Sequence, residues 1–268
     1  MNTPTPETIS IGIVTYNHSS VIARTVQAAL AGLPSGMPAH IWILDNRSGD
    51  ESVRLARDVA RTDSRVTVIE GHKNEGFAKA NNRILQRVDS TYHVLLNPDV
   101  TLTLGALEKL VEFLRASSDV AVVCPRVCFE DGRLQSLNRR YPTVLDLFLS
   151  RFMAGQNRRW FVQRMRRYRM EDVGYEHSYD VPFVSGAFMC CRTKVLKAVG
   201  GFDDSYFLYF EDVDLSRKIQ QAGWRTVYYP DAVVMHQWQR ATHHSHLHMR
   251  LFCVSAMRYF NKWGWRIW

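Results

Sequence analysis

The first hundred residues alternate between short apolar runs and amphipathic segments, and no other feature of the sequence constrains the fold as strongly. Apolar runs that read as strands occupy residues 9–15, 41–45, 66–70 and 92–96, and helical patterns fill residues 20–33, 51–61 and 78–87. Strands that alternate with helices indicate a parallel sheet. The sequence therefore predicts an α/β fold with a Rossmann-like, doubly wound and mostly parallel sheet.

The pattern becomes less regular after residue 120. We expect short strands within residues 120–129, a β-like run over 183–192, a helix near 212–221 and strands around Thr226 and Val233. This second half reads as mixed α+β. We predict a main domain over residues 1–238, which carries an insert at 139–170, and a helical C-terminal extension over 239–268.

Polar clusters follow the four predicted strands, at the edge where ligands bind in doubly wound sheets. They are Thr15-Tyr16-Asn17, Asp45-Asn46, Asn74-Glu75-Gly76-Phe77 and Asn97-Pro98-Asp99. The chain has no G-x-G-x-x-G after its first strand, no Gly-Lys dipeptide and no G-x-S-x-G elbow. These absences disfavour a classical dehydrogenase, a P-loop enzyme and an α/β-hydrolase.

The order and spacing of several clusters resemble glycosyltransferase family 2 over nearly the whole chain. Besides the four above, the resemblance rests on Ser48 and Asp50, Ala78 through Asn81-Asn82, Ser185-Gly186-Ala187, Gly201-Phe202-Asp203 and Phe210-Glu211-Asp212-x-Asp214. It implies the GT-A fold and inverting transfer of a sugar from a nucleotide diphosphate. The N-x-G-F-A and N-P-D motifs are similar to those of rhamnosyltransferases in surface-polysaccharide (O-antigen) assembly, so a dTDP-sugar is the expected donor and a UDP-sugar the alternative.

The resemblance implies a donor site on the polar rim. Its expected residues are Thr15, Tyr16, Asn17, Asp45, Asn46, Asn74, Gly76, Phe77, Asn81, Asn97, Gly186 and Glu211. Asp45 can accept the imide N–H of a uracil or thymine ring. The alternative is that Asp45, Asn46 or Ser48 only caps the following helix. Gly186 would allow close approach of the sugar, or else serve tight strand packing.

A metal site is expected at Asp99. The family pattern is D-x-D, which binds Mg²⁺ or Mn²⁺ on the donor diphosphate, and here Asn97 replaces the first Asp. An amide oxygen carries less charge, so the metal should bind more weakly. His236, which ends a late strand, is the expected further ligand, although a lone histidine there is often structural. The alternative for Asp99 is a cap on the helix that starts near Leu104.

Asp212 is the expected general base, by resemblance to the family. A sugar hydroxyl is a poor nucleophile until a carboxylate takes its proton during attack. The alternative is that Glu211, Asp212 and Asp214 merely favour a helix N-terminus electrostatically. His243, His244, His246 and His248 would form an active-site flap or a solvated turn.

The net charge of +8 resides in two segments. Residues 139–170 hold nine arginines and one acidic residue, Asp146, and residues 240–268 hold five cations and no acidic residue, so the remaining body is net acidic. Both segments interleave cations with apolar side chains, as helices at a bilayer interface do. The alternatives are a solvated arginine face or a dimer contact.

Membrane contact suits the lipid-linked saccharide acceptor that the resemblance implies, and we expect peripheral binding to the inner face of the cytoplasmic membrane. A rival interpretation is a basic nucleic-acid-binding protein. The sequence contains no helix-turn-helix, zinc-finger or RNP motif, so we expect no nucleic-acid partner. The first residues carry no signal-peptide pattern, and no apolar run is long enough to span a bilayer. Five cysteines do not form a disulfide framework and are expected to be buried thiols. Cys124 and Cys128 lack the second pair that a zinc site needs.

Overall fold

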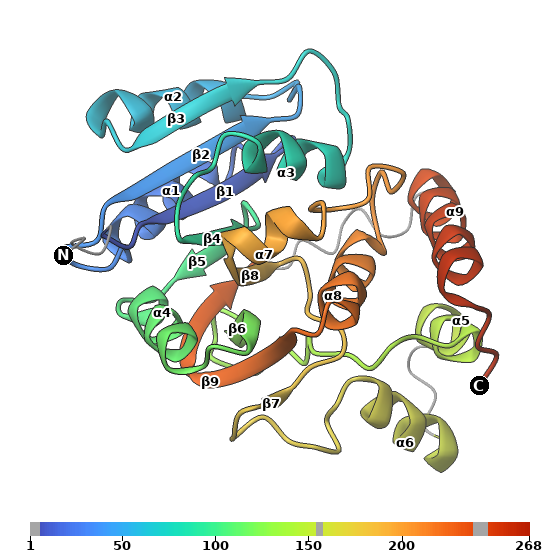
Figure 1. The fold of residues 1–268 in the computed structure, drawn as a ribbon. Helices are drawn as coiled ribbons and strands as arrows, with labels where there is room; N and C mark the ends of the chain where they lie inside the picture. The colour runs from blue at the N-terminus through green and yellow to red at the C-terminus, as the bar shows by residue number, and fades with distance from the viewer. Residues whose placement is uncertain (1–5, 154–157, 238–245) are drawn as a thin grey trace.

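The alternating first half forms the predicted strands and helices. The computed structural model describes residues 6–153, 158–237 and 246–268 (Figure 1). The first four strands are β1 (Ile9–Thr15), β2 (Ala39–Asp45), β3 (Val66–Glu70) and β4 (Tyr92–Leu96), joined by α1 (Ile22–Ala31), α2 (Ser52–Thr62) and α3 (Phe77–Leu85). Every residue of β1 and β4 is buried, because both strands lie inside the sheet and are covered on both faces.

The strands that the structure describes form one sheet in the order β3-β2-β1-β4-β8-β6-β9-β5, with β7 paired to β9. The second half supplies β5 (Val100–Leu102), β6 (Val120–Cys128), β7 (Tyr179–Asp180), β8 (Phe188–Arg192) and β9 (Arg225–His236). β1 to β4 pair in parallel, as do β6 and β9, whereas β8 is antiparallel to both β4 and β6. The predicted doubly wound sheet with a mixed second half is confirmed.

This topology gathers chain segments at one edge of the sheet. In the strand register Thr15 lies beside Asp45, Leu96 beside Phe188, and Cys128 beside Met235. The carboxyl ends of β1, β2, β4, β6 and β9 therefore meet the start of β8. We call this edge the carboxyl rim.

Helices cover both faces of the sheet. Those of the second half are α4 (Ala106–Ala116), α5 (Val144–Phe152), α6 (Arg159–Tyr168), α7 (Thr193–Ala198), α8 (Glu211–Gln221) and α9 (His246–Trp263). Apolar residues of α1, α2 and α4 pack into one buried cluster with the sheet, and those of α3, α7 and α8 pack on the other face. No helix in the described ranges is long and apolar enough to cross a membrane.

In Figure 1, helix α5 of the insert lies beside the end of α9 and the C-terminal segment. Thr143 and Asp146 form a capping box that starts α5, and Asp146 also accepts from Nε of Arg164 on α6 at 2.7 Å. The main-chain N–H of Val144 donates to the carbonyl oxygen of Arg266 at 2.8 Å. The two basic segments of the sequence therefore form one surface.

Three local expectations need correction. Residues 120–128 form one strand, and β9 is continuous from residue 225 to 236, because a register shift near Pro125 lets both strands extend without a break. The run from 183 becomes a strand only at Phe188, since Val184 to Ala187 turn toward α8. Cys253 is exposed on α9, while the other four cysteines are buried and free.

Candidate active site

Asn46 shapes the loop that follows β3. Its Nδ2 donates to Oδ1 of Asn74 at 2.9 Å and to the carbonyl oxygen of Gly76 at 3.1 Å, and its Oδ1 accepts from the N–H of Glu75 at 3.0 Å. Oδ1 of Asn74 also accepts from the N–H of Gly76 at 3.0 Å. Both amides thus hold the loop in place, and a direct contact of Asn46 or Asn74 with a donor stays a prediction.

The Asp45 carboxylate binds within its own loop. Oδ2 accepts from the N–H of Ser48 at 2.9 Å, and Oδ1 accepts from Oγ of Ser48 at 2.5 Å. It does not cap α2, because Asp50 bonds to Ser52 in the first turn of that helix, at 3.0 Å from its N–H. Each Asp45 oxygen retains a second lone pair, but the residue is only 2% exposed, so binding of a base at Asp45 stays a prediction.

The residues after β1 differ in their hydrogen bonds and in their exposure. Asn17 lies in the left-handed region with φ 59°. Its N–H donates to Oγ of Ser48 at 2.9 Å, and its Oδ1 accepts from the N–H of Gly49 at 2.8 Å.

 The side chain of Asn17 therefore joins the loops after β1 and β2. Thr15 is fully buried, whereas Tyr16 is 45% exposed and is the residue of this cluster most accessible to a ligand.

Two predicted residues on α3 have different roles. Nδ2 of Asn81, which is buried, donates to the carbonyl oxygen of Phe77 at 2.9 Å inside the helix. Phe77 instead faces the rim, since a Cβ added at Gly186 would lie 3.5 Å from its ring. Asn81 therefore stabilises the first turns of α3, and donor binding by either residue stays a prediction.

Gly76 joins the two halves of the rim. Its φ is +83°, and a Cβ at this position would lie 2.3 Å from the carbonyl oxygen of Phe207. That same oxygen accepts from the N–H of Phe77 at 2.8 Å. Only glycine combines this conformation with so close an approach, so Gly76 allows the loop after β3 to touch the loop before α8.

Unpartnered oxygens follow β4. Oδ1 of Asn97 and Oδ1 of Asp99 are buried and have no hydrogen-bond partner. Nε2 of His236, at the end of β9, lies 3.4 Å from Oδ2 of Asp99. Two hydrogen bonds to main-chain oxygens fix the turn. Oγ1 of Thr25 donates to the carbonyl oxygen of Pro98 at 2.6 Å, and the N–H of Gln237 donates to the carbonyl oxygen of Asp99 at 2.9 Å.

These residues fit a divalent cation. Buried oxygens without a partner are costly, and a bound cation would satisfy both. Two oxygens and an imidazole nitrogen form a donor set that Mn²⁺ or Mg²⁺ accepts. Among the described residues no three His, Cys, Asp or Glu gather closely enough to hold a metal. The set at this turn has only two residues of these types, Asp99 and His236, and Asn97 adds an amide oxygen. Asp99 does not cap α4, whose N-cap is Gly105.

Asp212 lies in the first turn of α8. Its Oδ2 accepts from the N–H of Gly186 at 3.0 Å, and its Oδ1 accepts from the N–H of Val213 at 2.9 Å. Burial raises the pKa of Asp212, against the effect of these hydrogen bonds. A carboxylate with a raised pKa is a stronger proton acceptor than an exposed one.

Glu211, beside Asp212, is buried with an unpartnered Oε2. Burial and the neighbouring Asp212 charge raise the pKa of Glu211 well above its usual range. The helix starts from two consecutive residues in the left-handed region, Tyr209 at φ 68° and Phe210 at φ 67°. Such backbone is costly outside glycine, and it occurs here directly before the two carboxyl groups.

We call Asn97, Asp99 and His236 the cation-type cluster. One short segment connects this cluster to Asp212. The carbonyl oxygen of Ala187 accepts from the N–H of Asn97 at 3.0 Å, and the preceding residue, Gly186, donates to Asp212. The structure therefore brings Asp99, His236 and Asp212 to the carboxyl rim that also bears Asp45.

Two further residues at this rim, His18 and Gln135, are not among the predicted site residues. His18 donates its N–H to Oγ of Ser52 at 2.8 Å, and burial lowers its pKa, although Asp99 and Asp50 oppose that shift. Its position directly after Asn17 was the available signal. Gln135 bonds to His236, and no local pattern marked it.

The histidine-rich run is only partly described. His243 and His244 lie outside the described residues, and the flap expected there stays a prediction. His246 is exposed at the start of α9, and Nδ1 of His248 lies 2.8 Å from the hydroxyl of Tyr209.

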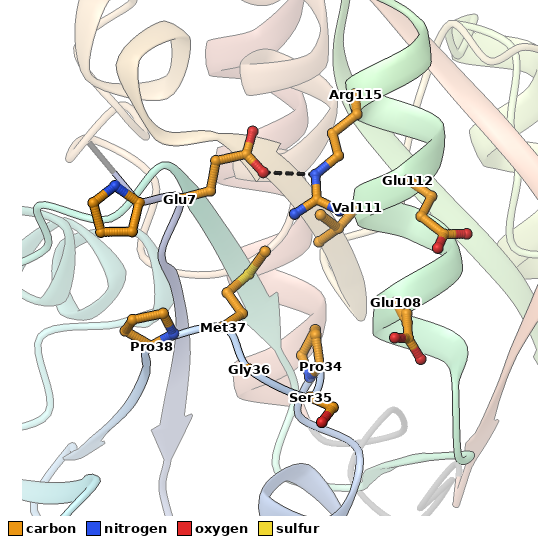
Figure 2. Close-up of a pocket in the computed structure, with 11 residues that line it drawn as sticks. Glu7, Pro34, Ser35, Gly36, Met37, Pro38, Glu108, Val111, Glu112 and Arg115 are labelled. Atoms are coloured by element: carbon orange, nitrogen blue, oxygen red, sulfur yellow. Dashed lines mark hydrogen bonds and ion pairs between the residues drawn. The ribbon is translucent and has the colours of Figure 1, made fainter. Parts of the chain in front are cut away.

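A cavity of about 240 Å³ lies away from the rim, near the start of β1 (Figure 2). Figure 2 shows the Glu7 carboxylate bound to Nε of Arg115, at 2.6 Å, on one side of it. Glu7 precedes β1 and Pro38 precedes β2, so the cavity belongs to the amino ends of the strands. It is not the candidate active site.

Comparison with known sequences gives consistent results. A family model described as "Glycosyltransferase like family 2" matches residues 6–250. The chain is 26% identical over 251 residues to the N-acetylglucosaminyl-diphospho-decaprenol L-rhamnosyltransferase of Mycobacterium tuberculosis, covering 88% of this chain and 78% of that protein. It is 27% identical over 199 residues to the rhamnosyltransferase WbbL of Escherichia coli, covering 72% of this chain and 67% of that protein.

Solved structures share the fold. A mannosyltransferase from Pyrobaculum calidifontis, solved with GDP-Man and Mn²⁺, aligns with a TM-score of 0.66 at 17% identity, over 97% of this chain and 65% of that one. GalNAc-T7, solved with UDP, GalNAc and Mn²⁺, aligns with a TM-score of 0.65 at 18% identity, over 85% of this chain and 43% of that one. Both similarities concern the GT-A fold.

Proposed function

Because this chain belongs to glycosyltransferase-like family 2, we propose that it is an inverting, metal-dependent hexosyltransferase that transfers L-rhamnose from a dTDP-sugar. The proposed acceptor is a hydroxyl of a lipid-linked saccharide in cell-surface polysaccharide synthesis. The names of the two rhamnosyltransferase relatives support the sugar, and that of the mycobacterial relative supports the acceptor class. A UDP-sugar is the alternative donor, because a carboxylate at Asp45 accepts the imide N–H of either base.

One observation carries the proposal. The main-chain N–H of Asn97, whose side-chain oxygen is unpartnered like that of Asp99, binds Ala187, and the carboxylate of Asp212 binds the preceding residue, Gly186. A cation-binding set and a proton acceptor at opposite ends of one segment are what direct displacement of a nucleotide diphosphate requires.

The reaction is a single displacement in which Asp212 is the proposed base. The acceptor oxygen attacks the anomeric carbon on the face opposite the diphosphate while Asp212 takes its proton. Its hydrogen bonds from Gly186 and Val213 fix the carboxylate plane and leave one lone pair on each oxygen for the hydroxyl. Asn97, Asp99 and His236 would hold Mg²⁺ or Mn²⁺, and such a cation would offset negative charge on the departing diphosphate.

The combined surface of α5, α6, α9 and the chain's end is the proposed membrane contact. Its exposed apolar side chains include Phe148, Phe152, Trp160, Trp265 and Trp268. Its exposed cations include Arg158, Arg159, Arg166, Arg167, Arg258 and Arg266. Aromatic rings at headgroup depth and arginines near lipid phosphates favour peripheral binding to an acidic bilayer, which we place on the inner face of the cytoplasmic membrane.

Thermal unfolding with a panel of nucleotide sugars tests this function. We expect dTDP-L-rhamnose with Mn²⁺ to raise the melting temperature more than UDP- or GDP-sugars do, and EDTA to remove most of that increase. A larger increase with a UDP-sugar would support the alternative donor. No increase with any nucleotide sugar would contradict the proposal.

A further inference from the structure

Gln135 reaches the imidazole of His236 through a turn that follows β6. The Gly132 N–H donates to the Phe129 carbonyl oxygen at 2.9 Å, which closes the turn. The chain then returns beside β6, and the Gln135 N–H donates to the carbonyl oxygen of Val127 at 2.8 Å. This return places the Gln135 side chain against the last residue of β9.

Both polar atoms of the Gln135 side chain bind His236. Nε2 donates to the main-chain carbonyl oxygen of His236 at 2.7 Å, and Oε1 lies 2.9 Å from Nδ1 of its ring. Gln135 is 4% exposed and His236 is 7% exposed, so water does not compete freely for these bonds.

These two contacts determine where the ring proton lies. A carbonyl oxygen only accepts, so the amide nitrogen of Gln135 must face it, and this requirement fixes which end of the amide is oxygen. The amide oxygen then faces Nδ1 and also only accepts, so Nδ1 carries the hydrogen. In a neutral imidazole, Nε2 then has a free lone pair, 3.4 Å from Oδ2 of Asp99.

We propose that Gln135 is a positioning residue that holds His236 as the Nδ1–H tautomer, so that Nε2 is presented as a ligand beside Asp99 and Asn97. The inference rests on the proposed metal role of His236. Hydrogen bonds to the second nitrogen of a ligating histidine set its tautomer and orientation, and their loss weakens metal binding by about 10- to 100-fold.

The tautomer can be measured in the metal-free protein. Long-range ¹H–¹⁵N correlation spectra of histidine-labelled protein at pH 7.5, assigned by comparison with His236→Gln, should show the Nδ1–H form at His236. In Gln135→Leu we expect that preference to be lost. An Nε2–H tautomer in the wild-type protein, or an unchanged spectrum in the variant, would overturn the inference.

Metal binding gives a second measurement. Titration with Mn²⁺, followed by electron paramagnetic resonance, should show that Gln135→Leu lowers the affinity for Mn²⁺ by about tenfold or more. Gln135→Glu keeps an acceptor for Nδ1–H but loses the donor to the carbonyl oxygen, so we expect it to retain wild-type affinity or better. A residue that only held the chain would lose affinity equally in both variants, and that result would contradict the inference.

Gln237→Leu is the matched control. Gln237 is adjacent to His236, but its side chain binds Glu130, so we expect its Mn²⁺ affinity and its His236 tautomer to match the wild type. Absence of Mn²⁺ binding by the wild-type protein would contradict the proposed function, while the metal-free spectra would still decide the tautomer.

Discussion

Gly186 donates its main-chain N–H to Oδ2 of Asp212 at 3.0 Å, and this bond holds the candidate base against the segment that leads into β8. A Cβ at Gly186 would lie 3.4 Å from Cβ of Asp212, so the two residues are in close contact. The carbonyl oxygen of the next residue, Ala187, accepts a hydrogen bond from the N–H of Asn97. The position of the base is therefore tied to that of the cation-type cluster.

Replacing Gly76 with alanine should separate the two halves of the rim. The new Cβ would lie 2.3 Å from the Phe207 carbonyl oxygen, at a φ that alanine rarely adopts. We expect a loss of about 1–3 kcal/mol in the free energy of unfolding, measured by urea denaturation, and weaker binding of nucleotide sugar. Gly36→Ala has a similar φ of +71° with no atom within 4 Å, so it should cost less and leave binding intact. Equal effects of the two changes would contradict the role of the Phe207 contact.

Replacing Asn97 with aspartate should change stability and metal affinity in opposite directions. A second carboxylate beside Asp99 repels it in the metal-free protein and attracts a divalent cation more strongly. We expect a lower melting temperature without metal and Mn²⁺ affinity several-fold higher, measured by differential scanning fluorimetry and titration. Unchanged affinity would show that Asn97 does not ligate.

The stability of the fold should fall in mild acid because of a buried histidine in β4. Burial, with a smaller effect of the Lys197 charge, lowers the pKa of His93 from 6.5 to about 3. The unfolded chain therefore binds a proton below pH 6.5 that the folded chain rejects, and stability declines as the pH falls from 6.5 toward 3. One such group costs about 1.4 kcal/mol per pH unit.

Urea denaturation at pH 7.5 and 5.5 checks this effect. The difference in unfolding free energy between the two pH values should shrink by about 1.4 kcal/mol in His93→Gln. The exposed His177 provides a matched control, since His177→Gln should leave the difference unchanged. An equal difference in His93→Gln and the wild type would refute the assignment.

The proposed membrane contact predicts salt-sensitive binding to acidic vesicles. Each arginine near an anionic surface contributes about 1 kcal/mol, so replacing Arg158 and Arg159 with glutamine should weaken binding by about 2 kcal/mol. Co-sedimentation with vesicles containing phosphatidylglycerol measures this change. The same replacements at Arg54 and Arg61, both exposed on α2, should have no effect. Equal binding to neutral phosphatidylcholine vesicles would contradict the proposal.

Most of the first half could be predicted from the sequence because its hydrophobic periodicity is strong. The bounds of β3 and β4 match the predicted ranges, since each is a short apolar run between polar residues. The continuous β9 was not predicted, because Pro230 and Asp231 interrupt its apolar pattern, and the pairing with β6 resumes at Val233 only after a register shift.

The location of the carboxyl rim was predictable because the ends of parallel strands converge. The hydrogen bonds of each polar side chain at the rim were not predictable. Asn46 and Asn97 both follow apolar strands, yet the Asn46 amide is held by three hydrogen bonds while Oδ1 of Asn97 has none. Gln135 acquires its contact with His236 from a turn and a strand pairing, neither of which its neighbours in sequence reveal. The union of the two basic segments likewise depends on the tertiary contact between Val144 and Arg266.

The transfer rate of Asp212→Asn tests the central claim most directly. With dTDP-L-rhamnose, Mn²⁺ and a lipid-linked saccharide acceptor, we expect the variant to lose about 10²- to 10⁴-fold in rate, as removal of a general base does, while nucleotide-sugar binding is retained. Asp58→Asn, on α2, should transfer at the wild-type rate. Undiminished transfer by Asp212→Asn would contradict the account.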